Sequence, residues 1–567
     1  MTHPSHDSDA QARLPAGFLC AFFVLMALPG LLWIALDRHP FGGDQSQYAT
    51  EAVNLFDTLV HSPSQWPSAM VHTMGFKPPG IAWIGQFFVP LGKLLGSIDA
   101  GLLLLPAVAQ LLTLVLTYRS IRGLAVGTPA AGLLGCLVIA SAPLTIQVGH
   151  DFLVETIQML ATAYFILIMV FATRWNRAGV LAHLLLATAL AVLAKATSPL
   201  FCFAPALLAL WGALAPARPP RPWAWSRPST LLPLGVGAVL AIGAVAWYQQ
   251  NLDNVRRHVA AASSGPVALY WGKDAPFLDA LVYWLGALGA GFFLRPIAVL
   301  ATAAFGVAAV VWALRRPRRR DGFTACAAVA VLEMAAVLAV FSANQSRVTR
   351  YLLPALPYVA LLLAWTLARL RSTAASRIAL LLVTLQFAFV QGHAFGWIHP
   401  GALNAWIRQI DSGGQSRRVL EAVVDRTCSV PRARPYLVII GVDPSLMGDW
   451  LAPAPASYIL AKRRLLTRRP SFCYYDYLGG GFFGGTAPEV WEDMLARRAR
   501  YFVTVDPRVY PVRGLVYNRG LDAENFPILL RTVRESGRFE AEPALREDQG
   551  IWIFRRLPGR RRWEDLG

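Results

Sequence analysis

Charged residues are scarce in this sequence. Of its 567 residues only 15% are Asp, Glu, Lys or Arg, whereas 55% are hydrophobic. A soluble domain is about a quarter charged, so the composition excludes an ordinary soluble domain, and the high apolar content excludes intrinsic disorder. Together with a mean hydropathy of +0.45, this composition predicts a membrane protein.

Cysteine is also rare. Six cysteines are too few for a disulfide framework, and the sequence has no Cys-x-x-Cys pair that would indicate a metal site. Four of the six lie in apolar runs, so only Cys428 and Cys473 could pair with each other. The sequence contains no convincing cluster of metal ligands, and we expect no metal and no cofactor.

Long apolar runs, in contrast, are frequent in this sequence. A helix needs about 20 apolar residues to span a bilayer, because its backbone polar groups must be satisfied internally. Eleven runs fit: 16–36, 101–118, 127–148, 153–173, 178–195, 199–214, 231–248, 296–314, 323–341, 351–370 and 376–394. Two shorter apolar segments, 80–96 and 278–294, are interrupted or end early, and we expect juxtamembrane or re-entrant helices there.

The positive charge fixes the expected direction of these spans. The net charge is +19, and most of the excess lies in short loops between apolar runs, where Lys and Arg mark the cytoplasmic side rather than a nucleic-acid partner. With eleven spans, every basic loop cluster falls in the cytoplasm. The N-terminus is then inside and the C-terminus outside. Residues 37–79, 149–152, 249–277, 342–350 and everything after about 395 are then external.

The predicted spans and their direction divide the chain into three parts. Residues 1–15 form a cytoplasmic tail, 16–395 a transmembrane domain, and 396–567 an extracytoplasmic α/β domain. In the last part, 436–441, 500–505 and 551–555 have the composition of buried strands, and 402–410, 416–427 and 488–499 have helical spacing. We expect Gly479–Gly485 to be a mobile loop.

The first external segment carries one acid that could act in chemistry. Asp44 follows the first span and two glycines, and a helix with one apolar face, lying along the membrane surface, is predicted from Gln45 to about Leu59. From the local sequence alone, a solvated loop acid or a helix N-cap is the simpler explanation of Asp44. Lys77, just before two prolines, could be an interfacial anchor whose long side chain reaches the lipid headgroups.

The second external turn contains two acids. Asp151 precedes an apolar helix, and Glu155 lies four residues on, which predicts the same helix face one turn deeper. An N-cap and a first-turn acid would explain the pair without any function. An acid below the interface is nevertheless costly unless it is used or paired. His150 is better explained as a hydrogen-bonded interfacial residue than as a metal ligand.

Basic side chains form the third external group. Arg347 and Arg350 lie beside Tyr351 at the end of a span, and guanidinium groups match phosphate with paired hydrogen bonds. Ordinary basic flanking of a span is the alternative, although external arginines run against the usual bias. Lys195 also reaches the external face, whereas Glu333, in the middle of a span, could be a structural acid paired within the bundle.

The order of these features resembles a known superfamily, the GT-C glycosyltransferases that include protein O-mannosyltransferases and lipid A aminoarabinose transferases. The resemblance covers roughly residues 15–395 and rests on Asp44 with Tyr48, then Lys77-Pro78-Pro79, Asp151, LAKATSPL and RYLLPALP. It implies a polytopic α-helical membrane protein of GT-C type, with about 11 spans, juxtamembrane helices and a C-terminal α/β extracytoplasmic domain.

The resemblance also implies roles. Asp44 would be the catalytic carboxylate and Asp151 a second catalytic acid. Lys77, Arg347 and Arg350 would bind the donor phosphate. The substrate cavity would include four further residues: Tyr48, Glu155, Lys195 and Tyr351. Gln45 and Gln47 stand where many relatives have Glu and Arg, which leaves the sugar and the acceptor open.

The predicted function is therefore transfer of a sugar from a polyprenyl-phosphate donor to a lipid A, glycan or protein acceptor. The expected location is the bacterial inner membrane, with the C-terminal domain in the periplasm. Partners would be the lipid-linked sugar, membrane lipids and the acceptor, and no nucleic acid. A glycolipid transporter or flippase without catalysis is the alternative. A weaker one makes the C-terminal domain a partner-binding module on an inert membrane anchor.

Overall fold

The computed structural model describes residues 14–124, 129–215, 227–264, 268, 272, 274–314, 322–370, 372–398, 407–428, 434–442, 450–468, 471–477, 486–506, 508–509 and 525–558. The chain divides into two compact units. The membrane unit consists of Met1–Ala35 and Ser64–Ile410, and the C-terminal unit consists of Leu36–Pro63 and Asp411–Gly567. Residues 36–63, which precede the predicted boundary at 395, therefore pack with the C-terminal unit.

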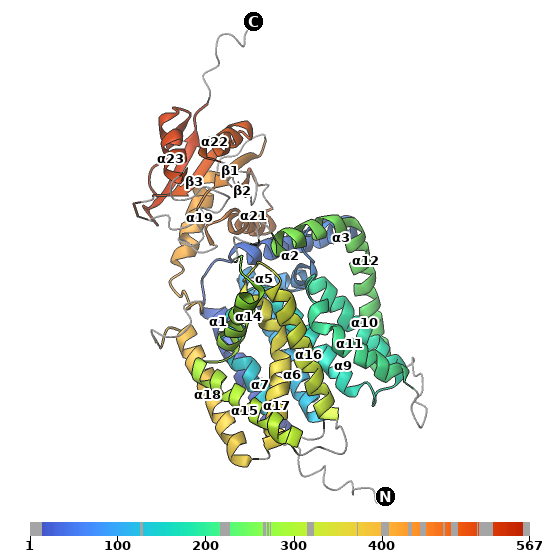
Figure 1. Cartoon of the computed structure of the whole chain (residues 1–567). Helices are drawn as coiled ribbons and strands as arrows, with labels where there is room; N and C mark the ends of the chain where they lie inside the picture. Colours follow the sequence, from blue (N-terminus) through green and yellow to red (C-terminus); the bar gives the residue numbers. More distant parts are fainter. Residues whose placement is uncertain are drawn as a thin grey trace, which may run out of the picture. The chain divides into compact units, whose positions relative to one another are not determined.

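The membrane unit is a helical bundle (Figure 1). Within the described residues, eight helical segments are long and apolar enough to cross a membrane. They are α1 (Ala16–Leu36), α6 (Ile98–Gly123), α10 (Arg177–Ala194), α12 (Pro228–Ser263), α15 (Arg295–Leu314), α16 (Gly322–Ser342), η5 (Thr349–Ala355) with α17 (Leu356–Leu370), and α18 (Thr373–Ala394). A ninth span is formed if α7 (Pro129–Ser141) and α8 (Pro143–Gly149), which are bent by 59°, cross together.

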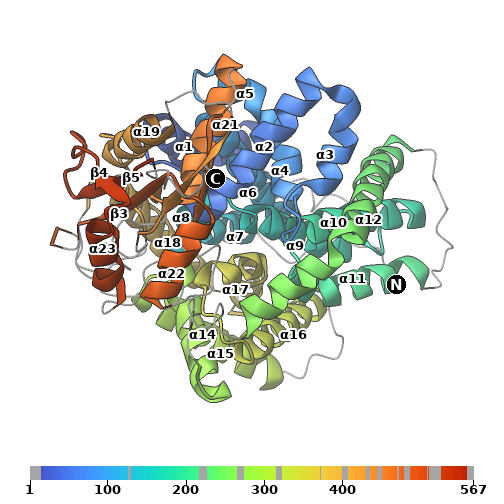
Figure 2. The same ribbon diagram turned by 90° about the horizontal axis from the view of Figure 1, so that it is seen from above.

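Three shorter apolar helices complete the bundle: α9 (Glu155–Phe171), α11 (Pro199–Leu214) and α14 (Phe277–Phe292). Each of the eleven predicted runs coincides with one of these helices or helix pairs, so the polytopic helical fold class is confirmed. The runs at 153–173 and 199–214 form helices of only 17 and 16 residues. In Figure 2, α10 lies beside α11 and α12, and it packs against both.

The two segments predicted not to span also form helices. Residues 80–96 form α4 (Gly80–Gly85), η4 (Gln86–Phe88) and α5 (Val89–Leu94). Pro90 lies in the first turn of α5, where a missing backbone N–H costs nothing. Residues 278–294 coincide with α14, which has 16 residues like α11, so its predicted juxtamembrane or re-entrant position stays a prediction. It ends before Arg295-Pro296, and α15 starts there.

Polar side chains satisfy the backbone where the spans are broken. Gln386 of α18 donates its Nε2 to the carbonyls of Ser141 (3.2 Å) and Phe292 (3.0 Å), and its Oε1 accepts the amide of Leu294 at 2.9 Å. Glu333 of α16 accepts the amides of Phe203 and Ala204 at 3.0 and 3.3 Å. The structural interpretation of Glu333 is therefore confirmed: it satisfies amides near the start of α11.

The C-terminal unit contains a five-stranded sheet in the order β2-β1-β3-β5-β4. The strands are β1 (Tyr436–Ile440), β2 (Cys473–Tyr477), β3 (Tyr501–Val505), β4 (Phe539–Ala541) and β5 (Ile551–Arg556). Strands β2, β1 and β3 are parallel, whereas β5 is antiparallel to both β3 and β4. The three predicted strands are confirmed.

Helices cover both faces of this sheet. Helices α19 (Gln415–Cys428) and α21 (Pro453–Thr467) bury one face, and α22 (Ala487–Ala496) and α23 (Asn525–Glu535) bury the other (Figures 1 and 2). The predicted helices at 416–427 and 488–499 are confirmed. Cys428 at the end of α19 is disulfide-bonded to Cys473 at the start of β2. The loop Gly479–Gly485 and most of the predicted helix 402–410 lie outside the described residues.

Residues 36–63 add a helix to this unit. Helix α2 (Gly43–His61) is the predicted helix after the first span, and it packs against α21. Its predicted position along the membrane surface stays a prediction, and the structure adds a protein partner, α21. Residues 63–72 continue as η3 (Pro63–Gln65) and α3 (Trp66–His72).

Candidate functional site

A buried carboxylate with two cations lies at the start of α9. Glu155 is the first residue of this helix, and only 1% of its side chain is exposed. Its Oε1 lies 2.8 Å from Lys195 Nζ and 3.2 Å from Arg350 Nε. The two cations come from the end of α10 and from η5, so three segments distant in sequence meet at one acid. With Tyr351, these residues form what we call the Glu155 cluster.

Two cations of the cluster approach the same carboxylate oxygen. Lys195 Nζ lies 3.5 Å from the centre of the Tyr351 ring, which holds the ammonium group by a cation–π contact. Lys195 and Arg350 both lie against the Glu155 carboxylate. The Lys195 and Arg350 side chains are 19% and 30% exposed, and both can therefore still meet an anion from solvent or lipid. Such an arrangement is suited to bind phosphate.

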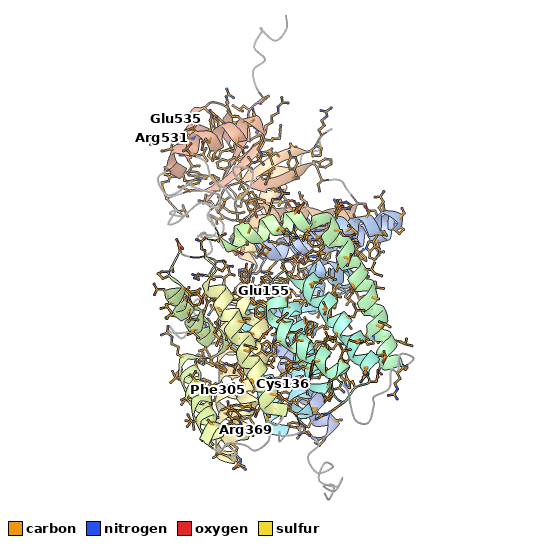
Figure 3. The ribbon with its side chains drawn as sticks, turned by 45° about the vertical axis from the view of Figure 1, so that its right-hand side comes forward. Cys136, Glu155, Phe305, Arg369, Arg531 and Glu535 are labelled. Carbon is orange, nitrogen blue, oxygen red and sulfur yellow. A yellow bond between two sulfur atoms is a disulfide. The ribbon has the colours of Figure 1, made fainter. Side chains whose placement is uncertain are left out.

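Local sequence explains how these side chains are presented. Helix α10 stops at Lys195, whose backbone is extended, and Pro199 starts the next helix four residues on. Arg350 lies in a 3-10 helix that contains Pro354. In Figure 3, Glu155 lies toward one end of the bundle and Arg369, from a predicted cytoplasmic cluster, lies at the other.

Lys77 lies in a loop that α12 holds against the end of α10. Trp247 Nε1 donates to the Thr73 carbonyl (2.7 Å), and Asn251 Nδ2 donates to the Val71 carbonyl (3.0 Å). Gly80 has no room for a side chain, because a Cβ there would lie 2.5 Å from the Leu193 carbonyl oxygen. The end of the loop that carries Lys77 therefore lies against Leu193, two residues before Lys195 in the sequence. Lys77 Nζ itself lies 5.3 Å from the centre of the Phe76 ring.

Arg347 is occupied within its own turn. Its Nη1 donates to the carbonyls of Asn344 and Ser346, the latter at 3.1 Å. The Tyr283 hydroxyl donates to the Arg347 carbonyl at 2.8 Å. These contacts order the turn before η5, and Arg347 is not among the cations on Glu155. Its predicted contact with donor phosphate stays a prediction.

Asp151 lies in a second cluster, away from the helix position that the sequence suggested. Helix α9 begins at Glu155 with Val154 before it, so Asp151 is neither its N-cap nor one turn above Glu155 on the same face. Arg408 Nη2 lies 3.3 Å from Asp151 Oδ1. The His150 ring stacks on Trp33 at 3.9 Å, and the Arg408 guanidinium lies 5.5 Å from the Trp33 ring centre.

Arg408 and Trp33 were missed by the sequence analysis. Trp33 lies within the first apolar run, and Arg408 lies in the stretch expected to be a helix of the C-terminal domain. Neither has a local pattern that would mark it. The Arg408 amide donates to Gln147 Oε1 at 2.7 Å, which fixes this segment beside α8. Asp151 is thus held by a residue 257 positions further along the chain.

Asp44 and Tyr48 lie on helix α2 and belong to the C-terminal unit. The N-cap of α2 is Gly42, and Asp44 is the second residue of the helix. The interpretation of Asp44 as an N-cap is therefore wrong. Its carboxylate lies in the first turn, where the helix dipole favours negative charge. Asp44 is half-buried, and Tyr48, on the apolar face, is 4% exposed.

No group of three or more His, Cys, Asp or Glu side chains suited to a metal ion occurs within the described ranges. The roles predicted for the individual site residues stay predictions. What the geometry adds is that four of them, Glu155, Lys195, Arg350 and Tyr351, lie together.

Comparisons with known proteins agree with the resemblance seen in the sequence. Residues 76–248 match the family model of dolichyl-phosphate-mannose-protein mannosyltransferases. The structure is similar to that of ArnT from Cupriavidus metallidurans bound to undecaprenyl phosphate, with a TM-score of 0.54, 14% identity, and coverage of 95% of this chain and 98% of that chain. The apo state of ArnT matches with a TM-score of 0.51 and 14% identity over 95% of this chain and 97% of that chain.

The chain has the fold of the GT-C glycosyltransferases. The resemblance seen in the sequence is confirmed at this level. The Archaeoglobus fulgidus oligosaccharyltransferase, in complex with Zn and sulfate, matches more weakly, with a TM-score of 0.45 and 12% identity over 86% of this chain and 68% of that chain. No curated protein matches this sequence. The GT-C fold is thus supported by structure over nearly the whole chain, whereas the family model covers only residues 76–248.

Proposed function

We propose that this chain transfers a sugar from a polyprenyl-phosphate donor to an acceptor at the outer face of a bacterial cytoplasmic membrane. The observation that carries the proposal is the structural match over 95% of the chain to ArnT, a protein described as bound to undecaprenyl phosphate. The Glu155 cluster supports it, because Lys195 and Arg350 are partly exposed cations of the kind that binds a lipid phosphate.

The reaction needs a base and a group of cations. The Asp44 carboxylate takes the proton of the acceptor hydroxyl as that oxygen bonds to the anomeric carbon. The bond between the anomeric carbon and the phosphate oxygen breaks, and polyprenyl phosphate leaves as an anion. Lys77 and Arg350 stabilise the negative charge that develops on the leaving phosphate. Asp151 is the second acid of the site, and no resident cofactor takes part.

The disulfide supports the proposed location. Disulfides persist in oxidising compartments such as the bacterial periplasm and are rare in the cytosol. Cys428 and Cys473 join α19 to the sheet inside the C-terminal unit. A periplasmic C-terminal domain agrees with the charge pattern of the loops and with an acceptor on the outer face.

The test is a transfer assay with purified protein in lipid vesicles. The vesicles receive a polyprenyl-phosphate sugar, and the measured product is free polyprenyl phosphate together with glycosylated acceptor. Lipid A, a glycan and a peptide are offered in separate reactions. We expect free polyprenyl phosphate to accumulate with one acceptor class. Movement of the intact donor between leaflets, with no cleavage under any condition, would instead establish the flippase alternative.

A further inference from the structure

The helix that carries Asp44 is built into the C-terminal unit. Helix α2 buries Tyr48, Ala49, Ala52 and Val53, and it packs against α21. The Phe41 ring, just before α2, stacks on Tyr458 of α21 at 5.3 Å. The packing is therefore between the two helices and is not limited to the loops before them.

A polar contact at the far end of α2 completes the attachment. Arg464 of α21 donates its Nη2 to Asn54 Oδ1 at 2.6 Å. Its Nε lies 3.6 Å from Asp57 Oδ2. Glu51, one turn earlier on α2, is also within electrostatic range of this guanidinium. One arginine of α21 therefore faces three polar residues of α2.

The segment just before α2 is hydrogen-bonded to residues at the start of the C-terminal domain. The Arg38 amide donates to the Asp411 carbonyl, and the Asp411 amide donates to Asp37 Oδ1, both at 2.9 Å. Arg417 of α19 donates to the carbonyls of Arg38 (3.0 Å) and His39 (3.2 Å). Asp44 thus follows a turn whose backbone is tied to the start of the C-terminal domain.

We propose that the C-terminal domain is the positioning element for Asp44, and that turnover requires the contact between α21 and α2. This inference rests on the proposed function, in which Asp44 is the base. A base must lie within hydrogen-bond reach of the proton that it takes, and a displacement of 1 Å can cost about 100-fold in rate. The C-terminal domain would then contribute to catalysis without contacting substrate, and Arg464 would be a positioning residue.

Two neighbouring arginines provide a matched test. Arg464→Glu places a carboxylate against Asp57 and Glu51 and should loosen α2. Arg463→Glu makes the same charge change one residue away, where Arg463 pairs with Asp425 of α19 at 2.5 Å. Both arginines are about equally exposed, at 41% for Arg463 and 43% for Arg464. The full-length variants are compared in vesicles for kcat and donor KM, and by hydrogen exchange.

We expect Arg464→Glu to lower kcat at least tenfold while donor KM changes less than twofold. Hydrogen exchange should rise in residues 43–61 and stay unchanged in β1 and β3, which shows that the domain remains folded. Arg463→Glu should retain kcat and the wild-type exchange of α2. Adding Asp57→Lys to Arg464→Glu restores an opposite-charge pair and should recover at least a third of kcat.

Two results would overturn the inference. One is wild-type kcat in Arg464→Glu despite faster exchange in α2, because turnover would then not need the contact. The other is an equal loss of kcat in Arg463→Glu and Arg464→Glu, because the effect would then be a general one of charge. Faster exchange in β1 and β3 would show that Arg464→Glu unfolds the domain. In that case Asp57→Asn, which weakens the same contact less, replaces it in the comparison, and the same two results would overturn the inference.

Failure of the proposed function is seen separately. If the wild-type protein frees no polyprenyl phosphate with any acceptor, the transferase assignment fails, and the inference about turnover falls with it. If the wild-type protein is active and only the Arg464→Glu comparison fails, the transferase assignment stands and the positioning role is rejected.

Discussion

Glu155 shares one carboxylate oxygen between Lys195 and Arg350 in a site where only 1% of its own side chain is exposed. Removing the charge by Glu155→Gln would leave two cations facing each other without their acid. Because both cations are partly exposed, the loss should stay below that of a fully buried pair. We expect a decrease of about 1–3 kcal/mol in the free energy of unfolding.

The measurement is thermal unfolding of the detergent-solubilised protein. Asp253→Asn is the control, because Asp253 is 88% exposed and its oxygen lies 3.9 Å from Arg256, in a pair that contributes little. The control should unfold with the wild type. Wild-type stability of Glu155→Gln would mean that the cluster does not depend on this acid.

Glu51 provides a pH-dependent prediction. Burial raises the pKa of its carboxyl group above the ordinary value, and Arg464 only partly offsets this. The folded protein therefore binds a proton at Glu51 more readily than the unfolded chain, so stability falls as pH rises through the folded-state pKa. Glu51→Gln should raise the melting temperature at pH 7.5 and have little effect at pH 4. A variant that is equally stabilised at both pH values would show that the carboxylate charge is not the cause.

At the scale of single residues, the sequence predicted which side chains matter better than it predicted their partners. External Arg350 and Lys195 were recognisable because charge is rare beside apolar runs. Their convergence on Glu155 depends on how α9, α10 and η5 pack, and no local spacing contains that information. Asp151 illustrates the same limit, because its cation, Arg408, lies beyond the last span in the sequence.

At the scale of helices and strands, the breaks between helices affect stability, because a broken span leaves amides and carbonyls without partners in apolar surroundings. Gln386 serves two breaks at once, between α7 and α8 and between α14 and α15. Gln386→Leu should leave two carbonyls and one amide unsatisfied. Each buried polar group without a partner costs about 1–3 kcal/mol, so we expect a loss of about 3 kcal/mol in the free energy of unfolding.

Thr384→Val tests whether this loss is specific to the breaks. Thr384 lies on the same helix but is exposed, and its hydroxyl donates to the Leu380 carbonyl of its own helix. We expect a change within about 0.5 kcal/mol. Hydrogen exchange should rise around Leu294 only in Gln386→Leu. Unchanged exchange there would contradict the assigned hydrogen bond.

The elements were largely predictable, because their evidence is local. Run length and apolar content located the helices of the membrane unit, and Pro90 marked α5 as short. Helix α2 was predicted from its spacing, but its partner was not. An apolar helix face fits a membrane surface or another helix equally well, and α21 lies about 400 residues further along the chain.

For the whole molecule, the disulfide provides a check on the C-terminal unit. Cys428 and Cys473 enclose a separation of 45 residues, for which loop-closure entropy gives about 4 kcal/mol of stabilisation. Replacing both by Ser should destabilise the C-terminal unit by up to that amount. Denatured wild-type protein should titrate four free thiols without reductant, corresponding to Cys20, Cys136, Cys202 and Cys326. Six free thiols before reduction would disprove the bridge.

The most direct test of the account is turnover by Asp44→Asn in the vesicle transfer assay. The substitution keeps the shape of the side chain and removes the base. General-base catalysis contributes about 100-fold or more, so release of polyprenyl phosphate should fall by at least about 100-fold while the melting temperature and the thiol count stay at wild-type values. Wild-type turnover by Asp44→Asn would contradict the account.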